Sequence, residues 1–209
     1  MDKSRQIVQT AENMITIYQQ VSELLLMIEE TIAKEKFDGK SLEVQKSKKC
    51  TWDGSAAMNV PEKWMQRFFV RYYTEKTRNK TKRAIGIGVW IYGSLGAEMI
   101  SEKPYISCSV IEYNPQFESN LWEWVRKAGK NEKYAFEASE QKPLLYESVF
   151  QGDTEENEKE FERMRVFFTD LVSVTDQGKI NELILEPLKA IYEDKTTNLT
   201  FEHNYLSVS

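Results

Sequence analysis

Apolar residues recur at alternating spacings of four and three through the first part of the chain. The series is Ile7, Ala11, Met14, Tyr18, Val21, Leu25, Ile28 and Ile32. This is the seven-residue repeat of helices that pack along one seam, and neither proline nor glycine interrupts it. It predicts one helix over residues 3–36, on the order of 45–50 Å long at 1.5 Å per residue.

The apolar stripe of this helix is wider than a two-helix seam requires. It is broadened in its second half by Ile17, Leu24, Leu26 and Met27. A wide stripe suits packing against a domain or within a bundle at least as well as pairing of two helices. Two interpretations therefore stay open, a helix lying along its own domain and a self-association helix.

Two apolar runs, residues 84–94 and 104–114, predict neighbouring strands with two different faces. Strand side chains alternate between the two sides of a sheet. The aliphatic side is formed by Ile85, Ile87, Val89, Ile91, Ile106, Cys108 and Val110. The other side mixes small residues with aromatic ones, namely Gly86, Gly88, Trp90, Tyr92, Tyr105, Ser107, Ser109, Ile111 and Tyr113.

The remaining segments predict three more strands and several helices. A short helical start near Trp64 leads into a strand ending at Glu75, and residues 134–138 and 144–150 are two further strands. Residues 116–128 predict a helix closed by Gly129. Another helix opens at residues 152–154, and its apolar face is Phe161, Met164, Phe168 and Leu171. A last helix covers residues 176–193, where we expect Pro187 to kink or divide it.

This order of elements predicts an α+β fold. It combines a long N-terminal helix, a central and mainly antiparallel sheet of about five strands, and helices packed on the sheet, two of them C-terminal. The predicted division is a helix at 1–36 with a possible role in self-association, a linker at 37–59, a compact α+β domain at 60–195 and a tail at 196–209.

Composition narrows the function classes only slightly. Apolar residues make up 41% of the 209 residues and charged residues 29%, which is ordinary for a globular protein. The net charge of −5 gives no overall attraction to nucleic acid or anionic lipid. Two cysteines and one histidine do not suggest a metal site, so we expect no metal and no cofactor. No secretion signal or membrane-spanning segment is evident, so a cytoplasmic protein without membrane contact is the expectation.

The mixed face of the predicted sheet is a candidate binding surface. Its candidate residues are Trp90, Tyr92, Tyr105, Ser107 and Tyr113. Aromatic rings could stack on bases or on a partner, and Gly86 and Gly88 leave shallow space between them. Enough amphipathic helices are predicted to cover both faces, however, and aromatic residues are usually part of a core. The core interpretation is therefore favoured over the binding one.

A basic cluster lies around the turn that precedes residue 84. Its members are Arg67, Arg71, Lys76, Arg78, Lys80, Lys82 and Arg83, opposed within this stretch only by Glu75. Such a cluster next to Tyr72 and Tyr73 fits contact with a phosphate backbone. It fits a solvated hairpin end equally well.

Acidic residues near the predicted strands raise one catalytic alternative. Glu112, Glu137, Glu140 and Lys142 resemble the carboxylate and Glu-x-Lys set of metal-dependent nucleases, in which carboxylates hold Mg²⁺. Lys142 precedes Pro143 in an expected loop, whereas that motif sits within one strand. No catalytic residue is assigned on this basis.

The leading hypothesis is a non-enzymatic interaction or assembly protein that associates through its N-terminal helix, with a second copy or another protein as partner. The alternative is a nucleic-acid-binding protein, including a divalent-metal-dependent nuclease. No P-loop, nucleophile elbow or His-Glu-x-x-His motif occurs in the sequence.

Overall fold

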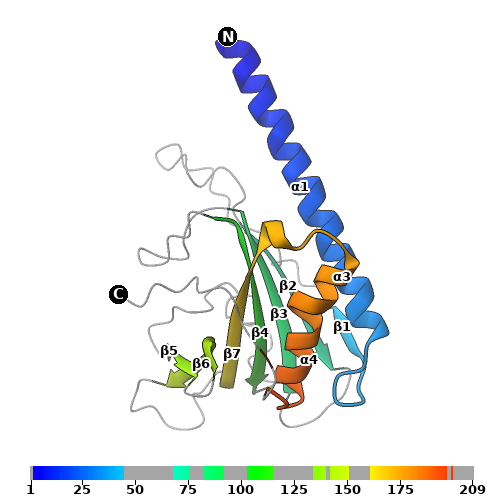
Figure 1. The fold of residues 1–209 in the computed structure, drawn as a ribbon, viewed down its shortest axis with the longest axis vertical. Helices are drawn as coiled ribbons and strands as arrows, with labels where there is room; N and C mark the ends of the chain where they lie inside the picture. The colour runs from blue at the N-terminus through cyan, green and yellow to red at the C-terminus, as the bar shows by residue number, and fades with distance from the viewer. Residues whose placement is uncertain are drawn as a thin grey trace.

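A computed structural model describes residues 2–44, 68–75, 82–91, 103–114, 134–139, 142–150, 161–196 and 199 (Figure 1). The helices are α1 (Lys3–Lys34), α3 (Gln177–Ile180) and α4 (Glu186–Tyr192), with a 3-10 turn, η4 (Leu171–Ser173), and a π-helical turn, η5 (Asn181–Leu185). The strands are β1 (Leu42–Val44), β2 (Phe68–Glu75), β3 (Lys82–Trp90), β4 (Tyr105–Tyr113), β5 (Tyr134–Ser139), β6 (Lys142–Phe150) and β7 (Phe161–Asp170). The helical start near Trp64, the helix at 116–128 and nearly all of the tail lie outside the described residues.

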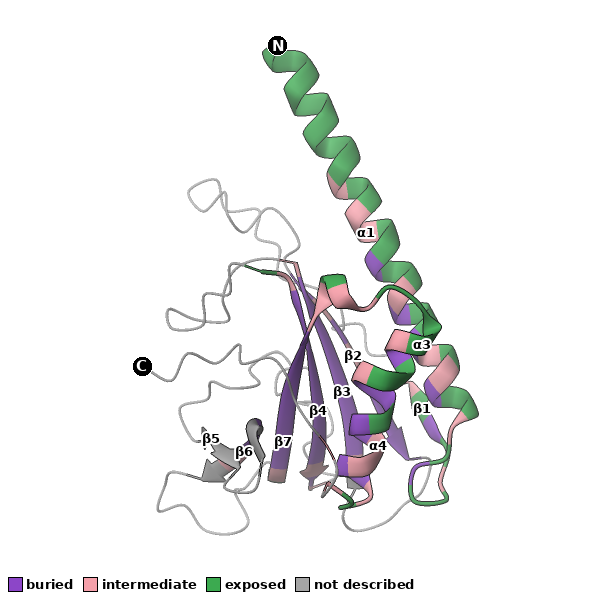
Figure 2. Cartoon of the chain, viewed as in Figure 1, coloured by how far each residue is buried: buried purple, intermediate pink, exposed green. Residues whose placement is uncertain are grey.

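The long N-terminal helix is confirmed as α1, which has 32 residues. Asp2 caps its start, because the Asp2 carboxylate accepts a hydrogen bond from the Ser4 backbone N–H at 3.2 Å. The helix ends two residues before the predicted boundary, where Glu35 becomes extended. Only the second half of the stripe is buried, through Val21, Leu25, Ile28 and Ile32 (Figure 2).

The predicted antiparallel sheet is also confirmed, and it is larger than expected. Its strands lie in the order β1-β2-β3-β4-β7-β6-β5, and all neighbours are antiparallel. The five predicted strands correspond to β2, β3, β4, β5 and β6. The two additional strands are β1, which lies within the segment expected to be a linker, and β7.

Strand β7 corrects one predicted helix. The spacing of Phe161, Met164 and Phe168 had favoured a helix, but residues 161–170 form a strand between β4 and β6. The period-two alternation was obscured because Arg163 and Arg165 point to the same side as Phe167. These arginines are held by acidic residues far away in sequence, so a strand that looks half polar lies mostly inside the protein.

Helices cover the aliphatic face of the sheet. Ile85, Ile87 and Val89 of β3 form one core with the buried side chains of α1 and of the C-terminal helices. Figure 1 shows α3 and α4 crossing in front of the strands and α1 passing beside them. Because the same aliphatic surface receives both helical segments, the second half of α1 is an integral part of the domain.

The C-terminal helical segment is interrupted, as the position of Pro187 predicted. A π-helical turn joins α3 to α4, and the Glu186 N–H reaches back to the Asn181 carbonyl. Pro187 follows directly in the first turn of α4, where its missing N–H costs least. The helix predicted at residues 176–193 is therefore present as two short helices, α3 and α4, which this turn separates.

The mixed face of the sheet is buried as well. A row of aromatic rings crosses five strands, in the order Phe68, Trp90, Tyr105, Phe168 and Tyr146, with neighbouring centroids 4.8–5.9 Å apart. Trp90 and Tyr105 are each 2% exposed. Stacked and edge-on rings at these distances contribute about 0.5–1.5 kcal/mol per pair beyond their burial.

Gly88 lies where this row leaves no room for a side chain. The Trp90 indole N–H donates to the Ser107 hydroxyl at 3.1 Å, directly over the Gly88 backbone. A Cβ placed on Gly88 would lie 2.5 Å from the Ser107 Oγ and 3.0 Å from the Trp90 Nε1. The close approach that this strand glycine indicates is thus made by side chains of the sheet itself.

We predict that Gly88→Ala destabilises the protein by about 1–3 kcal/mol, the usual cost of overpacking. In a double-mutant cycle measured by urea unfolding, Ser107→Ala should recover part of that loss because it removes the closest atom. Strictly additive effects of the two substitutions would contradict the proposed clash.

Candidate functional site

The first part of α1 is the most exposed apolar element of the described chain. We call residues 3–16 the arm and residues 17–34 the anchor. Figure 2 shows the arm projecting beyond the sheet, exposed along almost its whole length. Ile7 is 71% exposed, and Val8 and Ile15 are each 56% exposed. Large aliphatic side chains rarely remain together in water without a partner.

The heptad stripe changes its surroundings where the arm meets the anchor. Tyr18 contacts Phe69 of β2 edge-on at 5.7 Å, and Val21 is the first fully buried position. Ile17 and Leu24 pack against the core, whereas Leu26 is exposed on the outer side of the helix. The same stripe is therefore core in the anchor and surface in the arm.

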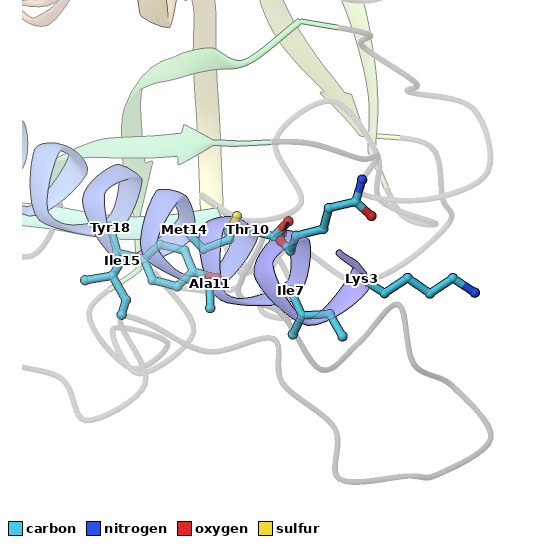
Figure 3. Close-up of a pocket in the computed structure, with 8 residues that line it drawn as sticks. Lys3, Ile7, Thr10, Ala11, Met14, Ile15 and Tyr18 are labelled. Carbon is cyan, nitrogen blue, oxygen red and sulfur yellow. Dashed lines mark hydrogen bonds between the residues drawn. The ribbon is translucent and has the colours of Figure 1, made fainter. Parts of the chain in front are cut away.

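A shallow groove follows the arm, with a volume of about 770 Å³ (Figure 3). The described residues that line it all belong to α1, and they are Lys3, Gln6, Ile7, Thr10, Ala11, Met14, Ile15 and Tyr18. Most of this lining is apolar, and Lys3 and Gln6 lie at its N-terminal end. Lys3, Arg5 and Glu12 are the only charged residues of the arm, so like-charge repulsion between two arms would be small.

A second apolar cavity, of about 670 Å³, lies at the base of the arm. From α1 it is lined by Ile17, Val21 and Leu24, and from the sheet side by Ile91, Leu171 and Val174 among others. Val172 on its rim is 69% exposed. The described lining of the groove ends at Tyr18 and that of the cavity begins at Ile17, so the two hollows follow one another along α1.

The proposed aromatic surface is closed in this structure. Trp90, Tyr105, Ser107 and Tyr113 are at most 2% exposed, and Tyr92 lies outside the described residues. The Ser107 hydroxyl is engaged with the Trp90 indole. Their burial agrees with the core interpretation of the mixed face.

The basic cluster is described only in part. Arg71 is half-buried on β2 and donates to the Val70 carbonyl at 3.1 Å. Arg83 is bound within the protein, as described below. Arg67, Arg78 and Lys80 and the side chain of Lys82 lie outside the described residues, so contact with nucleic acid remains a prediction.

Among the candidate nuclease residues, only Glu112 has a described side chain. Glu112 lies on β4 and Glu137 on β5, with β7 and β6 between them. Three strand spacings correspond to about 14 Å between the backbones of β4 and β5. Within the described ranges, no three His, Cys, Asp or Glu side chains gather as a metal site. Glu140 and the side chains of Glu137 and Lys142 are outside the described residues.

One charged cluster was missed by the sequence analysis. It joins Arg83, Arg163 and Arg165 to Glu112, Glu147 and Asp194 at one end of the aliphatic face. Strand register assembles it, because Glu112 lies opposite Arg83 on one side and Arg163 on the other. Only that register, which the sequence does not reveal, could have indicated the cluster.

The cluster holds the end of α4 against the sheet. Arg83 donates to the Tyr192 carbonyl at 2.6 Å, and Arg165 donates to Asp194 at 2.7 Å. The Tyr192 hydroxyl donates in turn to Glu75 at 2.6 Å. Three cations face three anions, so the cluster has no excess charge to attract a ligand, and its arrangement fits a structural role.

Asp194 is the most exposed carboxylate of this cluster, with 48% of its side chain exposed. Partial burial alone would raise the pKa of the Asp194 carboxyl, but the charge and hydrogen bond of Arg165 and the charges of Arg83 and Arg163 outweigh it. The pKa is therefore lowered from its ordinary value. Burial is the main cause that lowers the pKa of the Arg165 guanidinium, whose side chain is 4% exposed.

A scan against protein-family models, a search of curated proteins and a search of solved structures found no match. Among the described helices, none combines the length and apolar character needed to cross a membrane. Fold and surface together define an α+β protein with a helical arm that extends from its core.

We predict that Asp194→Asn lowers the free energy of unfolding at pH 7 by about 1 kcal/mol, a value kept small because the carboxylate is half exposed. Asparagine tolerates the left-handed backbone of this position, where φ is 56°, so the substitution chiefly removes charge.

The effect should depend on pH. A lowered folded-state pKa gives stability that is present above the unfolded value of about 3.9 and is lost as pH falls through the folded value. Urea unfolding should therefore show a larger difference from wild type at pH 7 than at pH 3. Glu30→Gln, an exposed position on α1, is the control. An equal difference at both pH values would contradict the charge-based account.

Proposed function

We propose that this is a non-enzymatic assembly protein that associates with copies of itself through the arm of α1. The observation that carries the proposal is the apolar stripe, which continues without a break from the buried anchor to the exposed arm. A stripe of this period is the form that helices use to pack against one another.

The anchor gives the arm a fixed direction. Val21, Leu25, Ile28 and Ile32 hold the helix in the core, and Lys189 of α4 pairs with Glu35 just beyond its end at 2.7 Å. Gln177 of α3 also donates to the Thr31 hydroxyl at 2.8 Å. A helix held in this way needs little further ordering when it binds, which lowers the entropic cost of association.

A second copy is the partner that fits the arm best. The apolar side chains of the second copy's arm would cover Ile7, Met14 and Ile15 of the first. The arm carries few charges, so charge repulsion would not oppose pairing. The e-type positions Val8 and Ile15 widen the stripe beyond the minimum for two helices, so both a dimer and a larger symmetric bundle are compatible with it.

Deleting the whole predicted helix would not test this proposal. Burying four Val, Leu or Ile side chains contributes roughly 6–12 kcal/mol at 1.5–3 kcal/mol each. That range is comparable to the whole stability of an ordinary domain, about 5–15 kcal/mol. Removing residues 1–36 would therefore unfold the domain, and the test must leave the anchor intact.

We predict that Ile7→Glu combined with Met14→Glu abolishes self-association without unfolding the domain. Both substitutions place charge on the stripe of the arm, where a partner helix would have to desolvate it. Light scattering coupled to size exclusion should find an oligomer for wild type and a monomer for the variant. The dissociation constant should rise at least about tenfold, which corresponds to 1.4 kcal/mol.

The matched control is Gln9→Glu combined with Thr16→Glu, which adds the same charge to the outer side of the same helical turns. This control should remain oligomeric. A monomeric wild type at several hundred micromolar would sink the proposal, and equal dissociation of the two variants would attribute the effect to net charge instead of the stripe.

A further inference from the structure

We propose that two copies pair antiparallel through their arms, and that the first turn of each α1 docks at the apolar cavity beside the other copy's anchor. This inference rests on the proposed self-association and adds its geometry. It follows from the fact that one face of α1 serves both the arm and the anchor.

A parallel pair is excluded by the domain itself. In a parallel pair the partner helix would run along the stripe from residue 7 towards residue 32. From Val21 onward that side of α1 is occupied by its own sheet and C-terminal helices. A parallel partner would therefore have to pass through the space that the core already fills.

An antiparallel pair avoids this collision. Figure 1 shows that the N-terminal end of α1 points away from the domain. An antiparallel partner would therefore run outward beyond residue 3, and the two domains would lie at opposite ends of the pair. If the four outer stripe positions pair with one another, Ala11 lies opposite Met14 and Ile7 lies opposite Tyr18. A small residue facing a large one is favourable for close packing.

This register brings the partner's first turn to the cavity. Residue numbers on the two helices then add up to 25, so along the axis the partner's Lys3 is level with Ser22 and its Val8 is level with Ile17. Ile17, Gln20, Val21 and Leu24 form the α1 side of the cavity. The path for the partner helix thus ends at an apolar cavity of about 670 Å³ whose rim includes the exposed Val172.

Distances between spin labels at Ser4 test the orientation. Both Ser4 and Ser22 are exposed. Cys50 would be replaced by serine, whereas Cys108 is fully buried and burial raises the pKa of its thiol, so it should not take the label. The antiparallel pair predicts that the two Ser4 positions lie about 26 Å apart along the axis, from 17 residues at 1.5 Å.

Mixing chains labelled at Ser4 with chains labelled at Ser22 should give a short separation, about 10 Å between helix axes. A short distance between the two Ser4 labels would overturn the antiparallel arrangement while leaving self-association intact. The absence of any distance between copies at high concentration would instead mean that self-association itself has failed.

The cavity contact has its own test. Val172→Gln should weaken the dimer about three- to tenfold, the loss expected when a buried apolar contact of about 1 kcal/mol is removed. Leu26→Gln, at another exposed apolar position, on the outer side of α1, should leave the dissociation constant unchanged. Equal constants for the two variants would overturn the docking of the first turn at the cavity.

Discussion

The packing of the α1 anchor on the aliphatic face of the sheet is the interaction on which the rest of the structure depends. Val21, Leu25, Ile28 and Ile32 lie in one core with the middle of β3 and β4 and with the C-terminal helices. This contact decides where the helix leaves the domain and which side of the arm is apolar. The geometry of the proposed assembly therefore depends on how the anchor packs in this core.

The sheet on which the anchor packs has buried side chains on both of its faces. On one side aliphatic side chains meet the helices, and on the other a row of aromatic rings crosses five strands. The charged cluster around Asp194 ties the end of α4 to the same sheet. The C-terminal helices are thereby held in the position where they contact α1.

Local patterns predicted much of this fold, and their failures have a common cause. The repeat in α1 and the alternation in β3 and β4 are properties of single segments, so the sequence alone could indicate them. Strand β7 was misread because the partners that neutralise Arg163 and Arg165 come from other strands and from the end of α4. The charged cluster was missed for the same reason, since only strand register brings Arg83 and Glu112 together.

The sequence of α1 was also insufficient to predict which part of the helix is buried. The heptad pattern is continuous, so it could not reveal that the stripe is exposed in the arm and buried from Val21 onward. Burial makes that distinction, and it turned two competing interpretations of one helix into two halves with different roles. The second half lies along its own domain, and the first half is proposed to bind a second copy.

Hydrogen exchange along α1, measured over a range of protein concentrations, tests this division most directly. Amides of the anchor should be strongly protected at every concentration, because they open only with the core. Amides of the arm should gain protection as concentration rises, because pairing stabilises them. Arm amides that are as protected as the anchor in the most dilute sample, or that do not change with concentration, would contradict the account.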